Sequence, residues 1–479
     1  MRHALDPVSL EQQLGSGAQS AAEAIERCVH CGFCLATCPT YAEVAEEADS
    51  PRGRIVLMKE VLEGGLELED ALPHVDACLG CLACETSCPS GVEYGGLLRP
   101  FREMAERRRS EGSTSPVRRA TRSRWIRRFL LPVMETPRRF LFALRLGRLA
   151  GPLRGLAPEA LRPALDLMPR GWPRGAGRLT GTHRPDGPAR ARVALLPGCV
   201  QQVIDLDIHH ATVDVLLRNG VEVVVPAGVG CCGALAAHAG EMDRARRLAR
   251  RNLGVLDPAD FDAVLTNAAG CGSAMLELGE WFEEGAERAG AERLAEKSKD
   301  VSAFLDELGL LQPAEQPETT DVVLQHACHL LHGQGVRDAP ANLLRRVPGL
   351  RLLDTPEAEL CCGSAGLYNL EQPTMARRLG HRKVRKLLET GARVVVSGNV
   401  GCMVQLKRHL EESQEPDSEE GVRPSVVFER LEVSNPDLSA STSSVANVGS
   451  RRSPGVGREA LRVRHVMQVL RDAYQGRRV

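Results

Sequence analysis

The pattern of apolar and polar positions divides the chain near residue 191. Before this point, segments such as Ser20–Arg27 and Arg54–Glu63 are rich in helix-forming residues and show no strand-like alternation. After it, short apolar runs alternate with helical patterns, as buried parallel strands followed by helices do. These runs lie at Val193–Leu196, Val221–Val225, Ala263–Thr266, Val322–Leu324, Leu350–Leu353 and Val394–Val396. The pattern predicts a helical N-terminal module followed by parallel-sheet α/β structure.

The α/β part also contains an internal duplication. Each unit carries a single cysteine, then an adjacent cysteine pair followed by glycine, then another single cysteine. These are Cys199, Cys231, Cys232 and Cys271 in the first unit, and Cys328, Cys361, Cys362 and Cys402 in the second. The corresponding intervals agree to within one residue, which indicates a repeat of about 130 residues.

All eight of these cysteines follow predicted strands. Ligands of open α/β sheets gather at the carboxyl ends of the strands, so we expect the four cysteines of each unit to meet in one crevice. Such convergence suggests a further metal or cluster site. An irregular cluster, a zinc ion or a redox-active thiol pair all fit, because adjacent side chains on an extended backbone point apart and strain a regular cubane. The alternative is buried cysteine acting as a small apolar side chain.

Two cysteine runs of identical spacing mark the N-terminal module. Each has the form Cys-x2-Cys-x2-Cys-x3-Cys-Pro, which is the spacing of bacterial two-cluster ferredoxins. The fourth cysteine of such a run ligates the other cluster, because it cannot reach the cubane held by the first three. We therefore predict two [4Fe–4S] clusters. Cluster I is held by Cys28, Cys31, Cys34 and Cys88, and cluster II by Cys38, Cys78, Cys81 and Cys84.

Zinc and disulfides are weaker interpretations of these runs. Structural zinc usually takes two pairs of ligands, and it has no use for a third and fourth cysteine at this spacing. Disulfides would require an oxidising compartment, and the N-terminus shows no secretory signal pattern.

Two arginines between the runs, Arg52 and Arg54, are candidates for charge tuning. A cluster with four thiolates carries net negative charge, so a nearby arginine would stabilise its reduced form. The alternative is a solvated turn with ordinary surface arginines.

The overall charge and hydropathy limit the partners of the chain. Its net charge is −1, which gives no global attraction to nucleic acid. No apolar run approaches the roughly 18 residues that suggest a membrane span. Sixteen cysteines without a signal peptide indicate metal chemistry in a reducing cytoplasm, so we expect a cytoplasmic protein.

One segment departs from this charge balance. Residues 99–148 hold 15 arginines against 4 glutamates, with apolar residues interleaved. This is a basic amphipathic pattern, which can lie peripherally on the inner face of the cell membrane or dock an acidic partner. The alternative is a helical connector with one buried face.

These observations predict six regions. They are an α-helical two-cluster ferredoxin module (1–98), a basic amphipathic segment and linker (99–190), a first α/β Cys-Cys-Gly repeat (191–318), a second (319–410), a disordered insert (411–460) and a C-terminal helix (461–479).

Several motifs together resemble one known family. CVHCGFCLATCPTY (28–41), PRGRI (51–55), CLGCLACETSCPSGV (78–92), GCCGA (230–234), CCGSAG (361–366) and GNVGC (398–402) are similar to the glycolate oxidase iron–sulfur subunit. The resemblance covers about residues 22–410 and 463–470. It implies an electron-transfer subunit of a glycolate (2-hydroxy acid) dehydrogenase complex. Such a subunit passes electrons from a flavin subunit to a quinone or another acceptor while glycolate becomes glyoxylate.

A looser resemblance extends to other chains with paired Cys-Cys-Gly domains. Among them are the anaerobic glycerol-3-phosphate dehydrogenase small subunit and the catalytic subunit of heterodisulfide reductase, and a D-lactate dehydrogenase subunit is a further alternative. Heterodisulfide-reductase repeats end in Cys-x2-Cys, but here Ala268 precedes Cys271 and Asn399 precedes Cys402. The insert within 411–460 also departs from the family.

The sequence offers no convincing dinucleotide fingerprint or flavin-binding segment. Gly175-Ala176-Gly177 follows no strand and lacks the third glycine at its required place. Oxidation of a 2-hydroxy acid removes a hydride, which a flavin or nicotinamide must accept. We therefore expect FAD on a partner subunit only, and no catalytic residue for hydroxy-acid oxidation in this chain. The competing hypotheses are a reductase acting at the Cys-Cys-Gly sites and an iron–sulfur scaffold or sensor.

Overall fold

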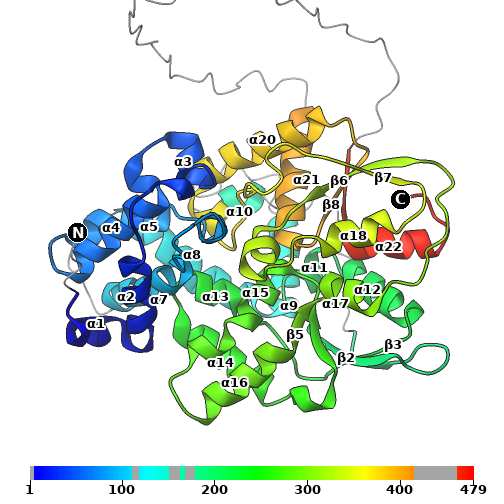
Figure 1. The fold of residues 1–479 in the computed structure, drawn as a ribbon, viewed down its shortest axis with the longest axis horizontal. Coiled ribbons are helices and arrows are strands. Elements are labelled where there is room, and N and C mark those ends of the chain that lie inside the picture. The colour runs from blue at the N-terminus through cyan, green and yellow to red at the C-terminus, as the bar shows by residue number, and fades with distance from the viewer. Residues whose placement is uncertain (1–4, 111–117, 150–161, 167, 169–178, 415–460) are drawn as a thin grey trace, which may run out of the picture.

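The structure is a computed structural model, and it describes residues 5–110, 118–149, 162–166, 168, 179–414 and 461–479. Two differently built parts lie side by side in Figure 1, a helical N-terminal part and a larger α/β part. The predicted fold class is confirmed. Residues 111–117, 150–161, 167 and 169–178 of the predicted basic segment and linker, and nearly all of the predicted disordered insert, lie outside the described residues.

The N-terminal part is built from helices joined by cysteine-bearing loops. Residues 5–98 contain no strand. Ser50 caps the helix Pro51–Leu62, because its hydroxyl accepts a hydrogen bond from the amide of Gly53. The apolar faces enclose a core that includes Ile25, Met58 and Phe101. The helices are α1 (Pro7–Leu14), α2 (Ala18–Glu26), α3 (Pro39–Val44), α4 (Pro51–Leu62), α5 (Leu68–Asp76), α6 (Ala83–Thr86) and α7 (Tyr94–Ser110), with 3-10 turns η1 (Gly15–Gly17), η2 (Phe33–Leu35) and η3 (Glu47–Asp49).

Two more helices connect this part to the rest of the chain. They are α8 (Arg118–Met134) and α9 (Pro137–Leu149), and the short α10 (Arg162–Asp166) follows. Ile126 and Leu131 of α8 are buried against Leu367 and Leu370. Arg127 is also buried and pairs with Glu371. The basic segment therefore packs partly onto its own fold.

The first repeat is an α/β unit around a five-stranded sheet of order β1-β3-β2-β4-β5. Strands β2 to β5 are parallel, and β1 pairs antiparallel to β3 within the predicted linker. The strands are β1 (Gly181–His183), β2 (Ala191–Leu195), β3 (Val221–Val225), β4 (Ala263–Thr266) and β5 (Ser298–Asp300). The helices are α11 (Gln201–Ile204), α12 (Asp207–Arg218), α13 (Ala234–His238), α14 (Met242–Leu253), α15 (Ala269–Leu276), α16 (Ala286–Lys297) and α17 (Val301–Leu308), with turns η5 (Pro258–Asp260) and η6 (Leu278–Trp281).

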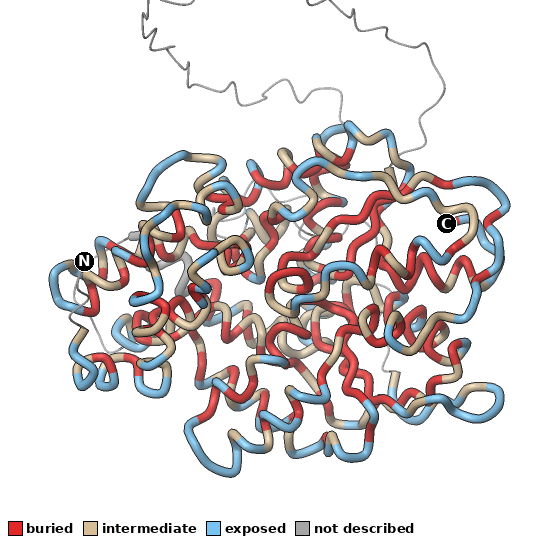
Figure 2. The backbone as a smooth tube through the Cα atoms, viewed as in Figure 1, coloured by how far each residue is buried: buried red, intermediate tan, exposed pale blue. Residues whose placement is uncertain are grey.

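The second repeat is built in the same way around a four-stranded parallel sheet of order β7-β6-β8-β9. Its strands are β6 (Thr320–Gln325), β7 (Leu350–Leu353), β8 (Val394–Ser397) and β9 (Arg462–His465). Its helices are α18 (Ala339–Arg345), α19 (Tyr368–Glu371), α20 (Pro373–Glu389), α21 (Val400–Gln414) and α22 (Val466–Tyr474), with the π-helical turn η7 (His329–Gly333). All six predicted strands are confirmed, and all of them except the edge strand β7 are largely buried (Figure 2).

The C-terminal segment differs from its prediction. A helix was predicted from residue 461, but Arg462–His465 form β9, which pairs with β8 at the edge of the second sheet. The helix α22 begins only at Val466 and packs against α12 of the first repeat. The spacing of Val463, Val466 and Val469 matches a helix, which led to the wrong prediction. In the strand, Val463 and His465 are buried and alternate with more exposed arginines.

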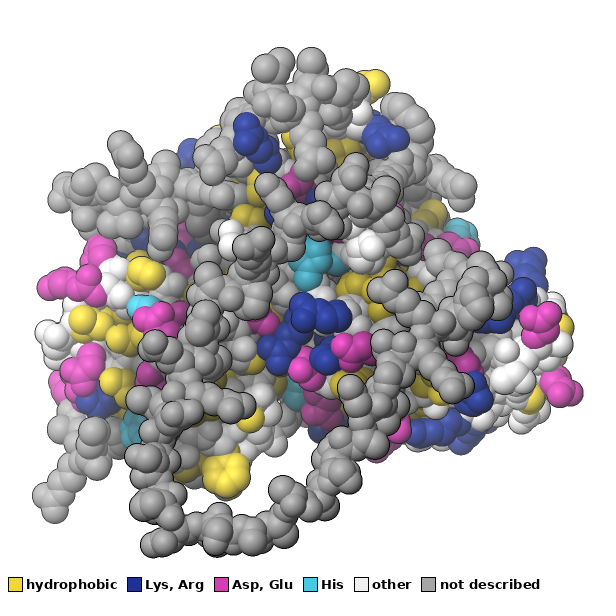
Figure 3. All heavy atoms as spheres, turned by 90° about the horizontal axis from the view of Figure 1, so that it is seen from above, with side chains coloured by type: hydrophobic (Ala, Val, Ile, Leu, Met, Phe, Trp, Pro, Cys, Tyr) yellow, Lys and Arg dark blue, Asp and Glu magenta, His cyan; other side chains and the backbone are white. Residues whose placement is uncertain are grey.

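Charges on the described surface are mostly balanced locally. On the face shown in Figure 3, arginine and lysine side chains lie beside aspartate and glutamate. Arg382, for example, pairs with both Glu43 and Glu357, which ties α20 to the N-terminal part. Among the described residues, no helix is both long and apolar enough to cross a membrane.

Candidate metal centres

The four thiols predicted for cluster I lie around a single cavity, and we call them the first thiol group. Cys28, Cys31, Cys34 and Cys88 line it together with Arg52. Cys28 and Cys31 come from the loop between α2 and η2, Cys34 lies in η2, and Cys88 follows α6. Cys31 is exposed, so this first thiol group lies close to the surface.

The other four thiols surround a neighbouring cavity. Cys38, Cys78, Cys81 and Cys84 line it together with Arg54, and Cys84 also borders the first cavity. Cys38, Cys78 and Cys81 are buried, which distinguishes this second thiol group from the first. The structure thus brings together the two sets that the crossed spacing rule predicts, while their ligation to iron stays a prediction.

Left-handed backbone turns direct the thiols of each run toward one point. His30 (φ 55°) and Gly32 (φ 86°) are left-handed in the first run, and Gly80 (φ 62°) and Leu82 (φ 62°) occupy the same places in the second. Left-handed conformations are costly for residues other than glycine and are concentrated at functional sites. Their recurrence in both runs fits loops that are shaped around a bound group.

The donor chemistry of both cavities fits an iron–sulfur cluster. Each cavity offers four sulfur atoms from one run and the end of the other, as a two-cluster module requires. Burial raises the pKa of the Cys81 and Cys84 thiols well above the ordinary value, so they would stay protonated on their own. A bound metal deprotonates a coordinating thiol outright, which removes this penalty.

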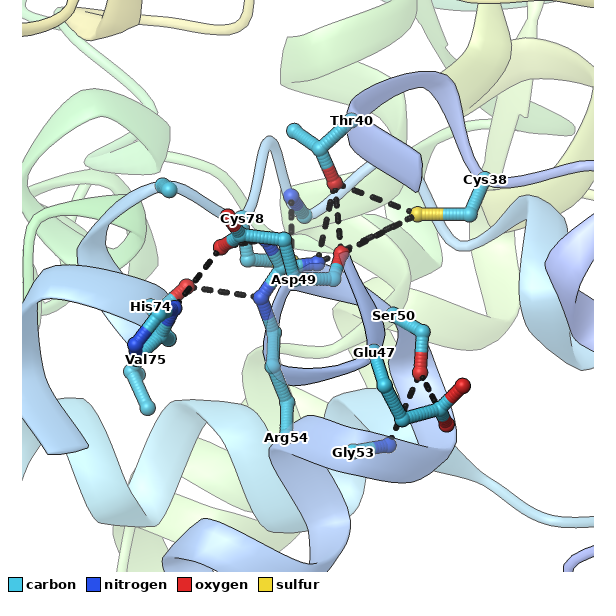
Figure 4. A network of polar contacts seen from close by, with 12 residues as sticks. Cys38, Thr40, Glu47, Asp49, Ser50, Gly53, Arg54, His74, Val75 and Cys78 are labelled. Atoms are coloured by element: carbon cyan, nitrogen blue, oxygen red, sulfur yellow. Dashed lines mark hydrogen bonds and ion pairs between the residues drawn. The ribbon is translucent and has the colours of Figure 1, made fainter. Parts of the chain in front are cut away.

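Arg54 is a buried cation beside the second thiol group (Figure 4). Its side chain is 1% exposed, and it donates to the His74 carbonyl at 2.6 Å, to Thr40 at 3.0 Å and to Asp49 at 3.2 Å. Burial opposes its charge, but the Cys78 thiol and other neighbouring groups raise the pKa of Arg54 above its ordinary value. The pKa of the Cys78 thiol is lowered in turn. Burial raises this pKa, but the charge of Arg54 and other neighbouring groups lower it by more.

Arg52 lies beside the first thiol group and is half-buried. It pairs with Glu47 through Nε at 2.6 Å and donates from Nη1 to the His30 carbonyl at 3.0 Å. The two arginines of the PRGR motif therefore face different cavities. Charge tuning by either one stays a prediction, but both lie where it would act.

The eight cysteines of the repeats line one cavity of about 460 Å³, which residues of the N-terminal part such as Gly80 and Leu82 also line. The prediction placed each set of four in a crevice, and the structure brings both sets to the same one. Gly233 and Gly363 are left-handed, and a Cβ added there would lie 3.2 Å from Ala245 O and 2.8 Å from Ala376 O, respectively. Glycine is thus required after each cysteine pair. We call this space the cysteine cavity.

Within each set, the adjacent cysteines contact different partners. Cys231 contacts Cys199 and Cys232 contacts Cys271. In the second repeat, Cys361 lies 4.0 Å from Cys328 and Cys362 contacts Cys402. Each repeat therefore offers four neighbouring sulfur atoms, a donor set that fits a metal or cluster.

The place of a fifth cysteine is taken by other residues. Ala268 and Asn399 line the cysteine cavity, and the Asn399 amide donates to the Cys402 sulfur at 3.3 Å. A five-thiolate site of the heterodisulfide-reductase kind therefore lacks one ligand in each repeat.

Four side chains hydrogen-bond to the backbone of the loop that carries Cys78 and Cys81. Four consecutive backbone carbonyls, those of residues 77–80, each accept a hydrogen bond from a different element. The donors are the Tyr368 hydroxyl to Ala77 (2.9 Å), Arg102 to Cys78 (2.7 Å), His238 Nε2 to Leu79 (2.8 Å) and His329 Nε2 to Gly80 (3.1 Å). Burial lowers the pKa of His238 to about 3 and also lowers that of His329, so both rings are neutral donors. We call this segment the clamped loop.

Sequence reasoning identified only part of this clamp. His326, His329 and His332 accompany Cys328 in the sequence, where they are candidates for proton donors or ligands, although a histidine near a cysteine is more often simply hydrogen-bonded. His329 hydrogen-bonds to the clamped loop, and His332 Nδ1 lies 2.7 Å from the Thr86 hydroxyl. Sequence reasoning missed His238 and Tyr368, which lie a few residues beyond the two Cys-Cys-Gly motifs and carry no local signal that they reach the N-terminal part.

Comparison with protein families agrees with these two kinds of centre. Residues 24–92 match the 4Fe-4S dicluster domain. Residues 193–276 and 322–407 each match the cysteine-rich domain. The second family matches the duplicated unit that the cysteine intervals indicate.

Comparison with individual proteins covers most of the chain. It is 36% identical to the "Probable glycolate oxidase iron-sulfur subunit" of Bacillus subtilis (strain 168), over 80% of this chain and 88% of that protein. It is 34% identical to the "Glycolate oxidase iron-sulfur subunit" of Escherichia coli (strain K12), over 83% and 93%. A fumarate reductase (CoM/CoB) subunit of Methanothermobacter marburgensis is 26% identical, over 80% and 68%.

Crossed ligation can be tested with a reciprocal pair of variants. Cys88→Ser should disturb the cluster of Cys28, Cys31 and Cys34 and largely spare the other, while Cys38→Ser should do the reverse. Electron paramagnetic resonance of the reduced full-length protein would separate the two spectra and report the loss of coupling between them. If Cys88→Ser removed the cluster of Cys78, Cys81 and Cys84 instead, the crossed assignment would be wrong.

Arg54 should matter more for stability than Arg52. Arg54→Met leaves Asp49 without a buried partner, and we expect a loss of about 3 kcal/mol of unfolding free energy. Arg52→Met breaks a more exposed pair and should cost less than about 1 kcal/mol. Anaerobic denaturant unfolding of both variants measures the difference, with Arg54→Lys as the variant that keeps the charge. Equal losses in the two Met variants would contradict this account of the buried pair.

Proposed function

The chain belongs to the glycolate oxidase iron–sulfur subunit family, an electron-transfer component of glycolate oxidation, and from this premise we propose a route for the electrons. They enter at the first thiol group, pass to the second and reach the cysteine cavity through the clamped loop. The observation that carries this proposal is the clamp itself, because it joins the second thiol group to both repeats. The site assignments on which it rests are those predicted from the cysteine spacing.

The first thiol group is the better entry point. Cys31 is exposed, and the neighbouring Val29 and Phe33 are each 67% exposed. The second group is mostly buried, and Cys81 packs with Cys328 and Cys361 of the second repeat in one apolar cluster. A donor at the surface would therefore meet the first group and not the second.

A flavin-bearing partner subunit is the donor that we propose. Removal of a hydride from a 2-hydroxy acid is a two-electron step that a flavin accepts, whereas an iron–sulfur cluster takes electrons singly. In this role the chain supplies the positions of the cluster ligands, the arginines beside them and a path shielded from water. A quinone is the terminal acceptor that we propose, with electrons leaving from the cysteine cavity.

The proposal predicts a division of labour that purification can test. The isolated chain should contain no flavin and should not oxidise glycolate with an artificial electron acceptor, whereas the complex with its flavin subunit should do so. Flavin analysis and steady-state assays on both preparations decide this. Robust glycolate oxidation by the flavin-free single chain would overturn the subunit assignment.

We also propose a peripheral membrane contact through α9. Phe142, Leu146 and Leu149 recur on one face of this helix and are 64%, 51% and 65% exposed. Arg138 and Arg145 are exposed on the same side. An apolar face bordered by arginine favours an anionic lipid surface, into which the apolar side chains insert while the guanidinium groups meet phosphate.

Vesicle binding tests this contact. The double variant Phe142→Glu/Leu146→Glu should bind phosphatidylglycerol vesicles at least tenfold more weakly than the unaltered chain in a co-sedimentation assay. Leu311→Glu, at another exposed apolar position, is the matched control and should bind as the unaltered chain does. Absence of binding by the unaltered chain, or equal binding by all three proteins, would argue against a lipid surface and in favour of a protein partner or none.

A further inference from the structure

The two repeats differ at one buried position behind their thiol sites. After each Cys-Cys-Gly motif the chain contains the same stretch, Ala-Arg-Arg-Leu-x-x-Arg, which begins at Ala245 in the first repeat and at Ala376 in the second. The next residue is Asn252 in the first repeat and Lys383 in the second. An uncharged side chain in one repeat therefore corresponds to a cation in the other.

The structure supports this equivalence independently of the sequence. Ala245 and Ala376 each place a backbone oxygen against the left-handed glycine of their own Cys-Cys-Gly motif. Counting seven residues along the helix from these alanines gives Asn252 on α14 and Lys383 on α20. Both side chains are buried, at 2% and 1% exposure.

Asn252 supports the backbone of the first thiol pair without adding charge. Its Oδ1 accepts from the Gly230 amide at 3.0 Å, and its Nδ2 donates to the Cys231 carbonyl at 3.0 Å. Both hydrogen bonds fix the segment that leads into the cysteine pair.

Lys383 holds the segment three to four residues before the second cysteine pair and brings a positive charge with it. Its Nζ donates to the Glu357 carbonyl at 2.5 Å and to the Ala358 carbonyl at 3.2 Å. Burial lowers the pKa of Lys383 to about 8, against the opposing effect of the Cys362 and Cys361 thiols, so the amine is still largely charged at neutral pH.

A buried cation acts strongly on a nearby redox site. In the low-dielectric interior, charges interact more strongly than in water, and reduction adds a negative charge that a fixed positive charge stabilises. The second repeat is also the one whose Cys328 and Cys361 pack against Cys81 of the second thiol group. The buried lysine and the contact with the second thiol group, from which electrons would arrive, thus occur in the same repeat.

We propose that Lys383 makes the thiol site of the second repeat a better electron acceptor than that of the first, so that electrons from the second thiol group settle there first. This inference rests on the proposed function. In the step concerned, one electron leaves the reduced [4Fe–4S] cluster of the second thiol group and reduces an iron–sulfur centre held by Cys328, Cys361, Cys362 and Cys402. No bond forms or breaks, and no group is transferred. Lys383 acts as a positioning residue through its charge.

Reciprocal substitutions at the two equivalent positions test the inference. Lys383→Met keeps the length of the side chain and removes the charge, whereas Asn252→Lys introduces a charge into the first repeat. The full-length protein is purified anaerobically, its iron per chain is measured, and its centres are titrated with redox mediators while electron paramagnetic resonance is recorded. The signals of the N-terminal clusters serve as the internal control.

We expect Lys383→Met to retain its iron and to lower the reduction potential of one centre by at least 59 mV. This shift is a tenfold change in the equilibrium constant of a one-electron reduction. Asn252→Lys should raise the potential of a different centre, and the N-terminal clusters should be unmoved in both variants. If both variants keep their iron and no potential changes, the role of Lys383 is overturned, while the assignment of the thiol sites is not affected. If Lys383→Met loses iron, Asn252→Lys decides: a raised potential supports the inference and an unmoved one overturns it.

Failure of the underlying site assignment has a different signature. The unaltered protein would then hold only about eight iron atoms per chain, four for each N-terminal cluster, and no further centre would titrate. That result would overturn the assignment of the repeats and this inference together, before any variant is compared.

Discussion

The four hydrogen bonds to the carbonyls of residues 77–80 are the interaction on which the arrangement of this molecule depends. They come from α7, α13, η7 and α19, so both repeats and the N-terminal part meet at one short loop. Buried carbonyls need partners, and each bond here satisfies one while it fixes the position of Cys78 or Cys81. Because these cysteines belong to the second thiol group, the same contacts that hold the two parts together also set the separation between that group and the cysteine cavity.

Buried cations next to buried thiols give the second constraint. A lone buried charge is expensive, so Arg54 and Lys383 would destabilise the fold unless negative charge lay close by. Asp49 and the thiols of Cys38 and Cys78 surround Arg54, while Cys361 and Cys362 lie near Lys383. Negative charge on these thiols would therefore stabilise both cations, and a metal-bound thiolate is the form in which a buried cysteine would carry it.

Much of this could be predicted from local sequence pattern, because the determining residues lie close together in the chain. The apolar runs marked six of the nine strands in the described residues, and the strand ends then placed the eight repeat cysteines. The contacts across the parts could not be predicted in this way. His238 reaches Leu79 across 159 residues and Tyr368 reaches Ala77 across 291, and neither has a spacing rule to reveal it. The strand β9 was missed because its apolar residues also fit a helix and because its partner β8 precedes a long intervening segment.

Anomalous diffraction at the iron absorption edge, on crystals of the anaerobically purified chain, tests the central claim most directly. That claim is a continuous route from the N-terminal clusters through the clamped loop to the cysteine cavity. It predicts iron peaks beside Cys28, Cys31, Cys34 and Cys88, beside Cys38, Cys78, Cys81 and Cys84, and within the cysteine cavity. Iron peaks confined to the N-terminal part, with the eight repeat cysteines free of metal, would contradict it.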